Sequence, residues 1–307
     1  MLQKFETEFE WLAARAPNVN STELAAMFGL SQYKSRFTLW CEKAGLNAPD
    51  FEDTPFTEWG KVLQVPVGMK LCKDRGWQGF DLTGYYLSCT ALRLGASMDL
   101  RAVSDEGDGL LEIKVAERLS EEAGWTAAQA PVEYEFQIQG QMHSAIKDGQ
   151  DIRWGGIGYL AQRQKSGVMH RLYDADLGKM IDIEVAEFWR SIVANEPPPP
   201  DYLADAALLE KLRGPLRDGD RIILTGNERA AQLLDSIRTL KELKKPLKSE
   251  LKRIETEQKK AENEFLQLMG RNEIAYIGDY RVKAKIQKRE DTVTYGSSFR
   301  RFDISKL

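Results

Sequence analysis

A run of four prolines, Pro197 to Pro200, constrains this chain most, because neither a helix nor a central strand can run through it. Such a run favours an extended spacer. Short apolar segments with glycines precede it, and a lysine-rich stretch with helical periodicity follows it. We therefore expect two domains, residues 1–200 and residues 201–307, which suits a length of 307 residues at about 150 residues per domain.

The part before the prolines mixes helical and strand-like patterns. Apolar residues at helical spacing predict helices around Phe9, from Ser21, and around Phe37. Short apolar runs with glycines over residues 80–116 predict strands joined by turns. We then expect a helix over residues 132–146, a hairpin that turns at residues 165–167, and a helix that ends before the prolines.

The part after the prolines reads as a long helix with a small hairpin. Its apolar residues recur at spacings of three, four and seven, a pattern typical of an amphipathic, coiled-coil-like helix. We expect Pro246 to break it into two helices, because proline in a helix interior costs about 3 kcal/mol. Beyond Gly270, alternating residues predict a hairpin that turns at Gly278 and Asp279.

Composition removes several classes of protein. Three scattered cysteines and two histidines exclude a disulfide scaffold and a histidine-rich zinc site. No apolar run approaches the roughly 18 residues of a membrane span, and the N-terminus lacks the pattern of a signal peptide. The formal net charge of −4 hides an asymmetry, since residues 241–307 hold 17 basic and 11 acidic residues. This basic end suits either phosphate binding or a solvated helix.

The central chemical signal is Asp99, followed thirteen positions later by Glu112, Ile113 and Lys114. Residues two apart in a strand share a face, so Glu112 and Lys114 project together. If the preceding turn brings Asp99 beside them, two carboxylates can hold Mg²⁺, and the carbonyl of Ile113 can add a further oxygen. Lys114 would then orient or deprotonate an attacking water. Taken alone, the same residues also fit a solvated strand face and a turn.

The predicted helix over residues 132–146 carries a polar stripe. Tyr134, Gln137 and Gln141 fall on one face by the i, i+3, i+7 rule, opposite Ile138 and Met142. Amides and a phenol on one stripe suit hydrogen bonds to phosphate oxygens or to metal-bound water. The alternative is a helix face that meets only solvent.

The order of these motifs resembles the phage YqaJ-type viral recombinase family, relatives of phage lambda exonuclease within the PD-(D/E)XK nuclease superfamily. The resemblance rests on ASMD, GLLEIK, YEFQIQGQM, the GIGYL hairpin and the FWRSIVANEPPP ending, preceded by STELAAMFGLSQYKSRFTLWCEKAG. It covers about residues 20–200. It implies a mixed α/β fold, a restriction-endonuclease-like core in which helices flank a central mixed sheet, with a C-terminal helical arm and small β-hairpin.

The resemblance also implies an activity and its residues. Asp99 and Glu112 look like the metal ligands, Lys114 like the catalytic lysine, and Gln137 like a glutamine that contacts the active site. The implied reaction is Mg²⁺-dependent degradation of double-stranded DNA from the 5′ end, with Mn²⁺ able to substitute. It leaves 3′ single strands for a single-strand annealing protein. The resemblance further implies a homo-oligomer, a trimer in lambda-like members, in the cytoplasm of a bacterial host.

Some assignments stay open at this point. Gln64 stands where family members carry a metal-ordering glutamate, so a second metal is weaker here or the alignment is shifted. Lys34, Arg36, Tyr134 and Gln141 are candidates for contacts with DNA. The alternatives to an exonuclease are an endonuclease of the same superfamily and a catalytically impaired DNA-binding or scaffold protein that acts through the coiled coil.

Overall fold

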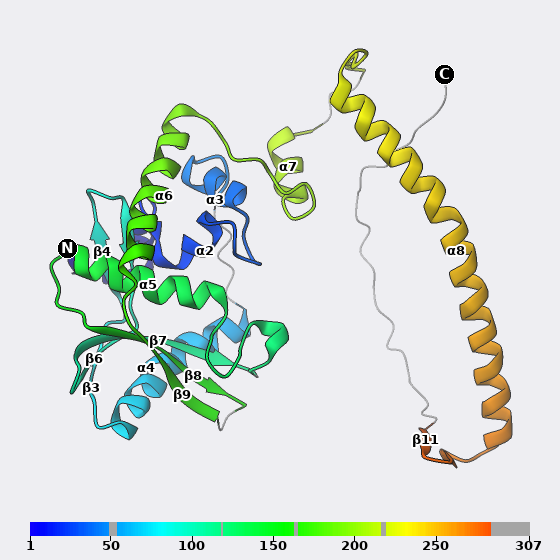
Figure 1. Cartoon of the computed structure of the whole chain (residues 1–307), viewed down its shortest axis with the longest axis horizontal. Coiled ribbons are helices and arrows are strands. Elements are labelled where there is room, and N and C mark those ends of the chain that lie inside the picture. Colours follow the sequence, from blue (N-terminus) through cyan, green and yellow to red (C-terminus); the bar gives the residue numbers. More distant parts are fainter. Residues whose placement is uncertain (49–53, 118, 163–164, 216–218, 284–307) are drawn as a thin grey trace. The chain divides into compact units, whose positions relative to one another are not determined.

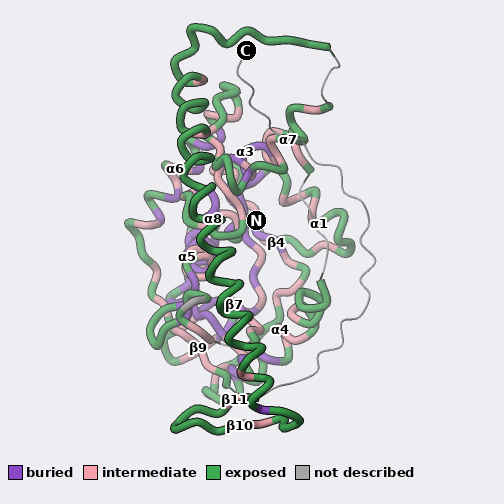
Figure 2. Tube along the Cα trace, turned by 90° about the vertical axis from the view of Figure 1, so that its right-hand side faces the viewer, coloured by how far each residue is buried: buried purple, intermediate pink, exposed green. Residues whose placement is uncertain are grey.

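A computed structural model describes residues 1–48, 54–117, 119–162, 165–215 and 219–283. The chain divides into two compact units, unit 1 (Met1–Leu216) and unit 2 (Arg217–Leu307), each of which we describe by itself (Figure 1). Figure 2 shows where the buried residues lie along the chain.

Unit 1 contains two β-sheets, of five and four strands, and all but one of the described α-helices. Its strands are β1 (Leu2–Lys4), β2 (Val19–Asn20), β3 (Gln78–Asp81), β4 (Tyr85–Cys89), β5 (Leu94–Ala96), β6 (Leu100–Ser104), β7 (Gly107–Ala116), β8 (Trp154–Ala161) and β9 (Lys165–Arg171). Its α-helices are α1 (Glu8–Arg15), α2 (Leu24–Met27), α3 (Arg36–Lys43), α4 (Pro55–Asp74), α5 (Val132–Lys147), α6 (Ala175–Ala194) and α7 (Ala206–Arg213), with short 3₁₀ turns η1 (Ser21–Glu23) and η2 (Glu121–Ala123).

The main sheet has five strands in the order β3-β6-β7-β8-β9. Strands β7 and β8 run parallel and the other neighbours run antiparallel. The parallel pair needs a crossover connection, and α5 lies within it. Helix α5 packs on one face of the sheet and α4 on the other (Figure 1). The predicted fold, a mixed sheet flanked by helices, is therefore confirmed.

Strand β8 is rich in glycine because both of its faces meet a helix or a neighbouring side chain at close range. A Cβ on Gly155 would lie 2.8 Å from Ile138 Cγ1 of α5. A Cβ on Gly158 would lie 2.6 Å from Ile113 Cδ1 and 3.0 Å from Leu71 Cδ1 of α4. Carbon atoms in contact normally stay about 3.5–4.0 Å apart, so the two helices approach this strand only where side chains are missing.

A second, smaller sheet has the order β1-β4-β5-β2 and leads into a helical layer. Buried side chains of α2, α3 and α6, such as Met27, Trp40 and Phe188, form one cluster there, to which Leu208 and Leu209 of α7 add apolar contacts. Helix α7 thus belongs to unit 1, although it follows the prolines. The predicted domain division at residue 200 stays a prediction.

In unit 1 the structure corrects one local prediction and adds one helix. Residues 165–167 lie in β9 and not in a turn, because they pair with residues 159–161 of β8. Helix α4 was not predicted, since Gly60, Pro66 and Gly68 obscure its periodicity. Pro66 is tolerated because α4 is long and packs on the sheet through Val67 and Leu71.

Unit 2 contains the long helix α8 (Glu228–Met269), followed by the hairpin of β10 (Ile274–Ile277) and β11 (Tyr280–Lys283). This hairpin confirms the predicted turn at Gly278 and Asp279. The prediction that Pro246 breaks the helix is wrong, because α8 is continuous through it. Pro246 is solvent-exposed, so water can satisfy the carbonyl oxygen that loses its helical donor. Across the described residues, no helix is long and apolar enough to cross a membrane.

Candidate active site

Successive side chains of β7 point to opposite faces of the sheet, and this alternation positions the central residues of the site. Leu111 and Ile113 point toward α4, where they join Val67 and Leu71 in a buried cluster. Glu112 and Lys114 therefore share the opposite face, on the side of α5. Glu112 is only 4% exposed, which is rare for a carboxylate without charged or hydrogen-bonding partners. This strand was predicted correctly, and its polar face is a buried one.

Asp99 comes from the connection between β5 and β6 and lies beside β7. Its Oδ2 accepts a hydrogen bond of 2.7 Å from the backbone N–H of Ile113. Burial and, after it, the nearby charge of Glu112 raise the pKa of Asp99 to about 8, against the opposing effect of Lys114. Two carboxyl groups thus face each other at a buried place where both cannot easily be charged without a cation.

Lys114 supplies one positive charge to this pair. Its Nζ donates to Glu112 Oε1 at 2.7 Å and to Gln137 Oε1 at 3.0 Å, and it lies 4.6 Å from the ring centre of Tyr134. Burial by itself lowers the pKa of Lys114, but the carboxylates of Glu112 and Asp99 outweigh it and raise the pKa above its ordinary value. Lys114 is therefore an ammonium group here, fixed in direction by two acceptors.

The polar stripe of α5 faces this cluster. Gln137 accepts the bond from Lys114, and Gln141 Nε2 donates to Glu112 Oε2 at 2.6 Å and to the Ser97 carbonyl at 2.8 Å. Glu112 is thereby held through both oxygens, by Lys114 on one and Gln141 on the other. The predicted common face of Tyr134, Gln137 and Gln141 is confirmed, while the catalytic role of each residue stays a prediction.

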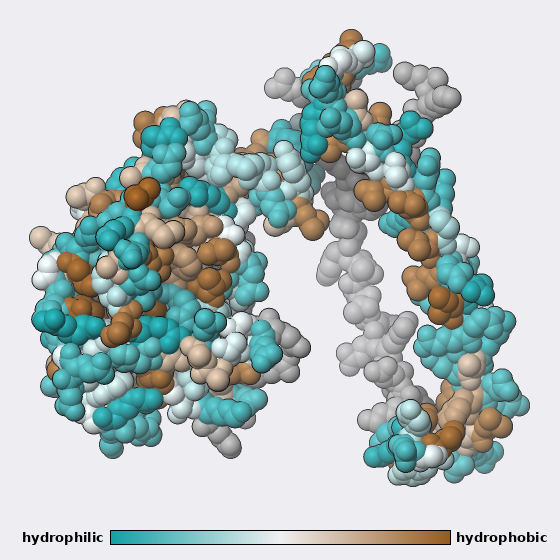
Figure 3. All heavy atoms as spheres, viewed as in Figure 1, coloured by the Kyte–Doolittle hydropathy of each residue, from teal (hydrophilic) through white to brown (hydrophobic). Residues whose placement is uncertain are grey.

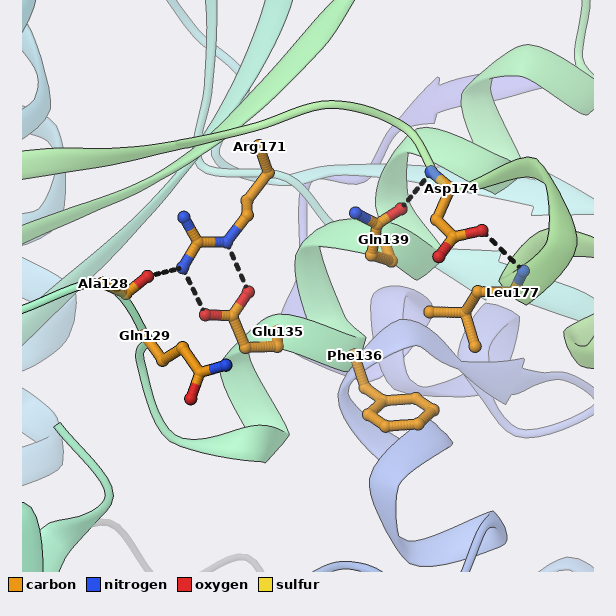
Figure 4. Close-up of a pocket in the computed structure, with 8 residues that line it drawn as sticks. All are labelled: Ala128, Gln129, Glu135, Phe136, Gln139, Arg171, Asp174 and Leu177. Atoms are coloured by element: carbon orange, nitrogen blue, oxygen red, sulfur yellow. Dashed lines mark hydrogen bonds and ion pairs between the residues drawn. The ribbon is translucent and has the colours of Figure 1, made fainter. Parts of the chain in front are cut away.

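The other flank of α5 fixes how this stripe is turned. Arg171 of β9 holds Glu135 through two hydrogen bonds of 2.7 and 2.5 Å, and Gln139 accepts from the backbone N–H of Asp174 (Figure 4). Gln139 Nε2 also donates to the Leu172 carbonyl at 2.8 Å. These contacts prevent the helix from rotating about its axis, so Gln137 and Gln141 stay aimed at β7.

The donor set fits a hard divalent cation. Within the described ranges, no three histidine, cysteine, aspartate or glutamate side chains gather around one point, so Asp99 and Glu112 form a pair only. Mg²⁺ usually takes one or two carboxylates, keeps several waters and binds substrate phosphate. A cation between the two carboxyl groups would relieve the repulsion that raises the pKa of Asp99. The predicted role of the Ile113 carbonyl as a third oxygen ligand stays a prediction.

An arginine that the sequence analysis missed contacts the segment that leads into Asp99. Arg15, at the end of α1, donates to Ser97 Oγ at 3.0 Å and to Thr22 Oγ1 at 3.3 Å, and its guanidinium lies 4.2 Å from the ring centre of Trp11. Burial lowers the pKa of Arg15. Because Ser97 is two residues before Asp99, Arg15 is linked to the carboxylate cluster by a single side chain.

Among the described residues, Arg15 makes no ion pair with a carboxylate, although the charge of Glu23 acts on it and raises its pKa against the effect of burial. Glu23 itself is paired with Lys43 at 2.8 Å and accepts hydrogen bonds from two donors of Asn20. Two buried side-chain oxygens also lack a hydrogen-bond partner among the described residues, Ser21 Oγ and Gln141 Oε1. A half-buried guanidinium that forms no ion pair with a carboxylate can bind an anion such as a phosphate.

Three other predicted residues lie apart from the cluster. Lys34 pairs with Glu42 at 2.6 Å and Arg36 with Glu184 at 3.0 Å, so both charges are already compensated. Gln64 is half-buried on α4, and among the described residues it makes no hydrogen bond to Asp99 or Glu112. Their predicted roles in DNA and metal binding stay predictions.

A cavity of about 480 Å³ adjoins the cluster on the side of Tyr134. Aromatic side chains of Tyr33, Phe56, Trp125 and Tyr134 line much of it. Tyr33 and Phe56 are largely exposed, at 77% and 59%. Exposed rings beside a charged site are suited to stacking on bases of a single strand.

The site lies within a range that a known family matches. Residues 10–148 match the family model described as the YqaJ-like viral recombinase domain. This range includes Arg15 and the whole cluster of Asp99, Glu112, Lys114 and Gln137, together with Gln141. The resemblance drawn from the sequence is thereby confirmed.

Solved structures share the fold. An alkaline exonuclease (LHK-Exo) from Laribacter hongkongensis, and the same protein in complex with dAMP, are each 22% identical, with a TM-score of 0.50. Each alignment covers 66% of this chain and 100% of the other. A phage-related exonuclease from Haemophilus somnus 129PT is 14% identical over 58% of this chain and 96% of its own, with a TM-score of 0.42. No curated protein matches.

Proposed function

We propose that this chain, in which residues 10–148 form a YqaJ-like viral recombinase domain, is a metal-dependent exonuclease that degrades linear double-stranded DNA from the 5′ end. The products would be 3′ single strands for phage-type homologous recombination. The observation that carries the proposal is the buried cluster of Asp99, Glu112 and Lys114, in which Glu112 is fixed through both oxygens. The fold shared with an alkaline exonuclease supports it.

In this proposal Asp99 and Glu112, with the carbonyl of Ile113, hold Mg²⁺, for which Mn²⁺ can substitute. The ion supplies charge neutralisation on the phosphodiester and lowers the pKa of a bound water. Lys114 orients the attacking water through its ammonium protons, and Gln137 keeps that ammonium group in place at 3.0 Å. Gln141 holds the second oxygen of Glu112, so that the carboxylate cannot swing away from the reacting phosphate.

Arg15 gives this site a means to select one end of the strand. A terminal phosphate carries more charge than an internal phosphodiester, and a guanidinium binds it through directed hydrogen bonds. DNA ends commonly carry the phosphate on the 5′ side and a hydroxyl on the 3′ side. An anchor for a terminal phosphate beside the metal ligands therefore favours cleavage that starts at the 5′ end.

The proposal extends to partners and place of action. Double-stranded DNA is the substrate, a single-strand annealing protein of the phage recombination type takes up the product, and the enzyme works as a homo-oligomer. We propose the cytoplasm of the bacterial host as its location. The positive surplus of residues 241–307 suits contacts with DNA phosphates.

The test is release of nucleotides from linear duplex DNA labelled at either the 5′ or the 3′ end, with Mg²⁺ or with EDTA, beside a covalently closed circle. We expect Mg²⁺-dependent loss of the 5′ label while the circle stays intact. Cutting of the circle would instead identify an endonuclease. If neither substrate is cut, the chain is a DNA-binding or scaffold protein, and the catalytic proposal is wrong.

Two variants separate the chemistry from end selection. Lys114→Ala should lower the rate on every linear substrate by about 10²–10⁴-fold, the usual contribution of a positioned catalytic group. Arg15→Gln should remove the preference for a 5′-phosphate over a 5′-hydroxyl end. The matched control is Arg190→Gln, an exposed arginine whose ion pairs with Glu187 and Glu196 lie far from any residue of the site in sequence.

If Arg15→Gln keeps the native preference for phosphorylated ends, then Arg15 does not bind the terminal phosphate. If Lys114→Ala keeps the native rate, the proposed role of the ammonium group in orienting water is wrong.

A further inference from the structure

Helix α8 repeats its apolar residues with a period of seven, in which two a positions hold polar residues. Written as a heptad abcdefg, each repeat has two core positions, a and d. The a positions are Ala230, Ile237, Lys244, Leu251, Gln258 and Phe265. The d positions are Leu233, Leu240, Leu247, Ile254, Ala261 and Leu268. Pro246 falls at a c position, on the outer face, so it does not interrupt this repeat.

The repeat forms an exposed apolar stripe. Leu240, Leu247 and Leu251 are 65%, 69% and 55% exposed, and Figure 3 shows hydrophobic side chains gathered along the helix. The hairpin β10–β11 follows the C-terminal end, where Met269 is buried. Among the described residues nothing covers the stripe from Leu240 to Ile254, where every residue is exposed.

A period of seven identifies the kind of partner. A straight helix has 3.6 residues per turn, so a stripe that repeats every 3.5 residues stays in contact only with a helix that supercoils around it. A helix that presented its stripe to a globular surface would have no need of a heptad period kept over five repeats. The partner of α8 is therefore another helix with the same repeat.

The charges beside the stripe indicate which helix pairs with α8. The e positions next to the core are Lys241 and Lys248 in the first half of α8, and Glu255 and Glu262 in the second half. The sign thus reverses at the middle of the helix. We propose that α8 pairs with α8 of a second copy of this chain as an antiparallel two-stranded coiled coil. Residues at e positions face each other in that arrangement.

In this pair each lysine meets a glutamate of the second copy. Lys248 faces the position of Glu255, and Lys241 faces that of Glu262, which gives four attractive contacts by two-fold symmetry. This is the self-complementary pattern that an isologous interface requires. Two like-charged contacts remain, because Glu250 of each copy faces Glu257 of the other. Within one chain these are already held by Arg253 at 2.6 Å and Lys260 at 2.9 Å.

The core layers of the same register also match. Each a residue meets a d residue of the second copy. The layers are Ile237 with Leu268, Leu240 with Phe265, Lys244 with Ala261, Leu247 with Gln258, and Leu251 with Ile254. Lys244 faces the small Ala261, over which its apolar stem can lie while the ammonium group reaches water. Each polar core residue therefore meets an apolar neighbour and not a second copy of itself.

A parallel pair is disfavoured by the same residues. In a parallel dimer Lys244 would meet Lys244 of the second copy inside the core. The contacts between g and e positions would join Glu250 with Glu255, and Glu257 with Glu262, all of the same sign. Opposite charges at these flanking positions set orientation in coiled coils. The sequence of α8 therefore selects the antiparallel pair, independently of the chemistry at Asp99.

The test is the mass of the full chain in solution, measured by multi-angle light scattering for the native protein and two charge variants. Lys241→Glu with Lys248→Glu makes all four e positions acidic, and Glu255→Lys with Glu262→Lys makes all four basic. We expect the native assembly to have twice the mass of either variant alone. An equimolar mixture of the two variants should regain the native mass, because acidic and basic helices then pair.

The measured quantity is the ratio of the native mass to the mass of a variant, so the test applies whether unit 1 is itself monomeric or oligomeric. Circular dichroism of each variant checks that the helix content is kept. If the native chain has the same mass as both variants, the second copy is not the partner of α8. If the basic variant pairs more tightly than the native protein, the helices are parallel, since the new lysines would then meet Glu250 and Glu257, and the proposed orientation is wrong.

Discussion

Gly140 of α5 lies where the helix that carries Gln137 and Gln141 packs closely against another segment. A Cβ built there would lie 2.3 Å from Leu24 Cδ1 and 3.3 Å from Ser21 Cβ. Carbon atoms in contact stay about 3.5–4.0 Å apart, so Gly140→Ala requires Leu24 to move by about 1.2–1.7 Å. Leu24 is completely buried, which leaves little room for that movement. The helix α5 must therefore shift away from η1 and α2.

Two opposing effects set how much Gly140→Ala changes the free energy of unfolding. Overpacking of a buried site costs about 1–3 kcal/mol, whereas replacing glycine by alanine within a helix gains about 0.8–1.0 kcal/mol. The net loss in the free energy of unfolding is about 1 kcal/mol. For a unit of this size that lowers the melting temperature by about 2–4 °C. The matched control is Gly60→Ala in α4, where nothing lies within 4 Å, and which should raise the melting temperature by a similar amount.

The effect on activity should exceed the effect on stability. Gln137 and Gln141 flank Gly140 on α5, so a displaced helix moves both amides relative to Lys114 and Glu112. A misplacement of about 1 Å can cost on the order of 10²-fold in rate. We expect Gly140→Ala to lose about 10–10²-fold in kcat on linear duplex DNA, while Gly60→Ala keeps the native rate.

Calorimetry measures the loss of stability in Gly140→Ala, and the nuclease assay measures its loss of activity. The loss in Gly140→Ala should shrink in a Leu24→Ala background, where the clash is removed, and a double-mutant cycle measures that coupling. If Gly140→Ala melts at or above the native temperature and keeps its rate, the helices are not packed at the distance described, and the argument from close approach fails.

Two further predictions concern stability. Burial alone raises the pKa of Glu23, but Lys43 and Asn20 outweigh it and lower the pKa below its ordinary value. The Glu23 carboxylate therefore stabilises the fold at pH values above its unfolded-state pKa. It loses that effect as the pH falls through its folded-state pKa. The difference in melting temperature between the native protein and Glu23→Gln should thus be largest near neutral pH and shrink on acidification, and a difference that grows with acid would refute the pairing. Gly109→Ala should lower the free energy of unfolding by about 3 kcal/mol or more through overpacking, because its Cβ would lie 2.1 Å from the Trp154 ring. Urea unfolding followed by tryptophan fluorescence measures this loss, and a native-like midpoint would show that the prediction is wrong.

Much of the site could be predicted from the sequence because it depends on local periods. Alternation along residues 111–115 places Glu112 and Lys114 on one face, and helical spacing places Gln137 and Gln141 on another. Both patterns survive folding, since the buried apolar residues between them, such as Ile113 and Ile138, fix which side faces the core.

Other features depend on contacts between distant segments. Arg15 meets Ser97 across 82 positions, and no motif joins an arginine at the end of one helix with a serine before a strand. Whether Lys34 and Arg36 are available for phosphate was likewise undetermined, because their partners Glu42 and Glu184 are set by how α3 and α6 pack.

The sequence by itself determined the alternation of β7, the polar stripe of α5 and the heptad of α8, because each is a repeat of side chains along one regular element. Only the tertiary structure decided that Glu112 is held through both oxygens, that half-buried Asp99 lies near it with a raised pKa, and that α8 continues through Pro246. These depend on burial and on the approach of separate elements, and burial is a property of the packed chain, which no short stretch of residues specifies.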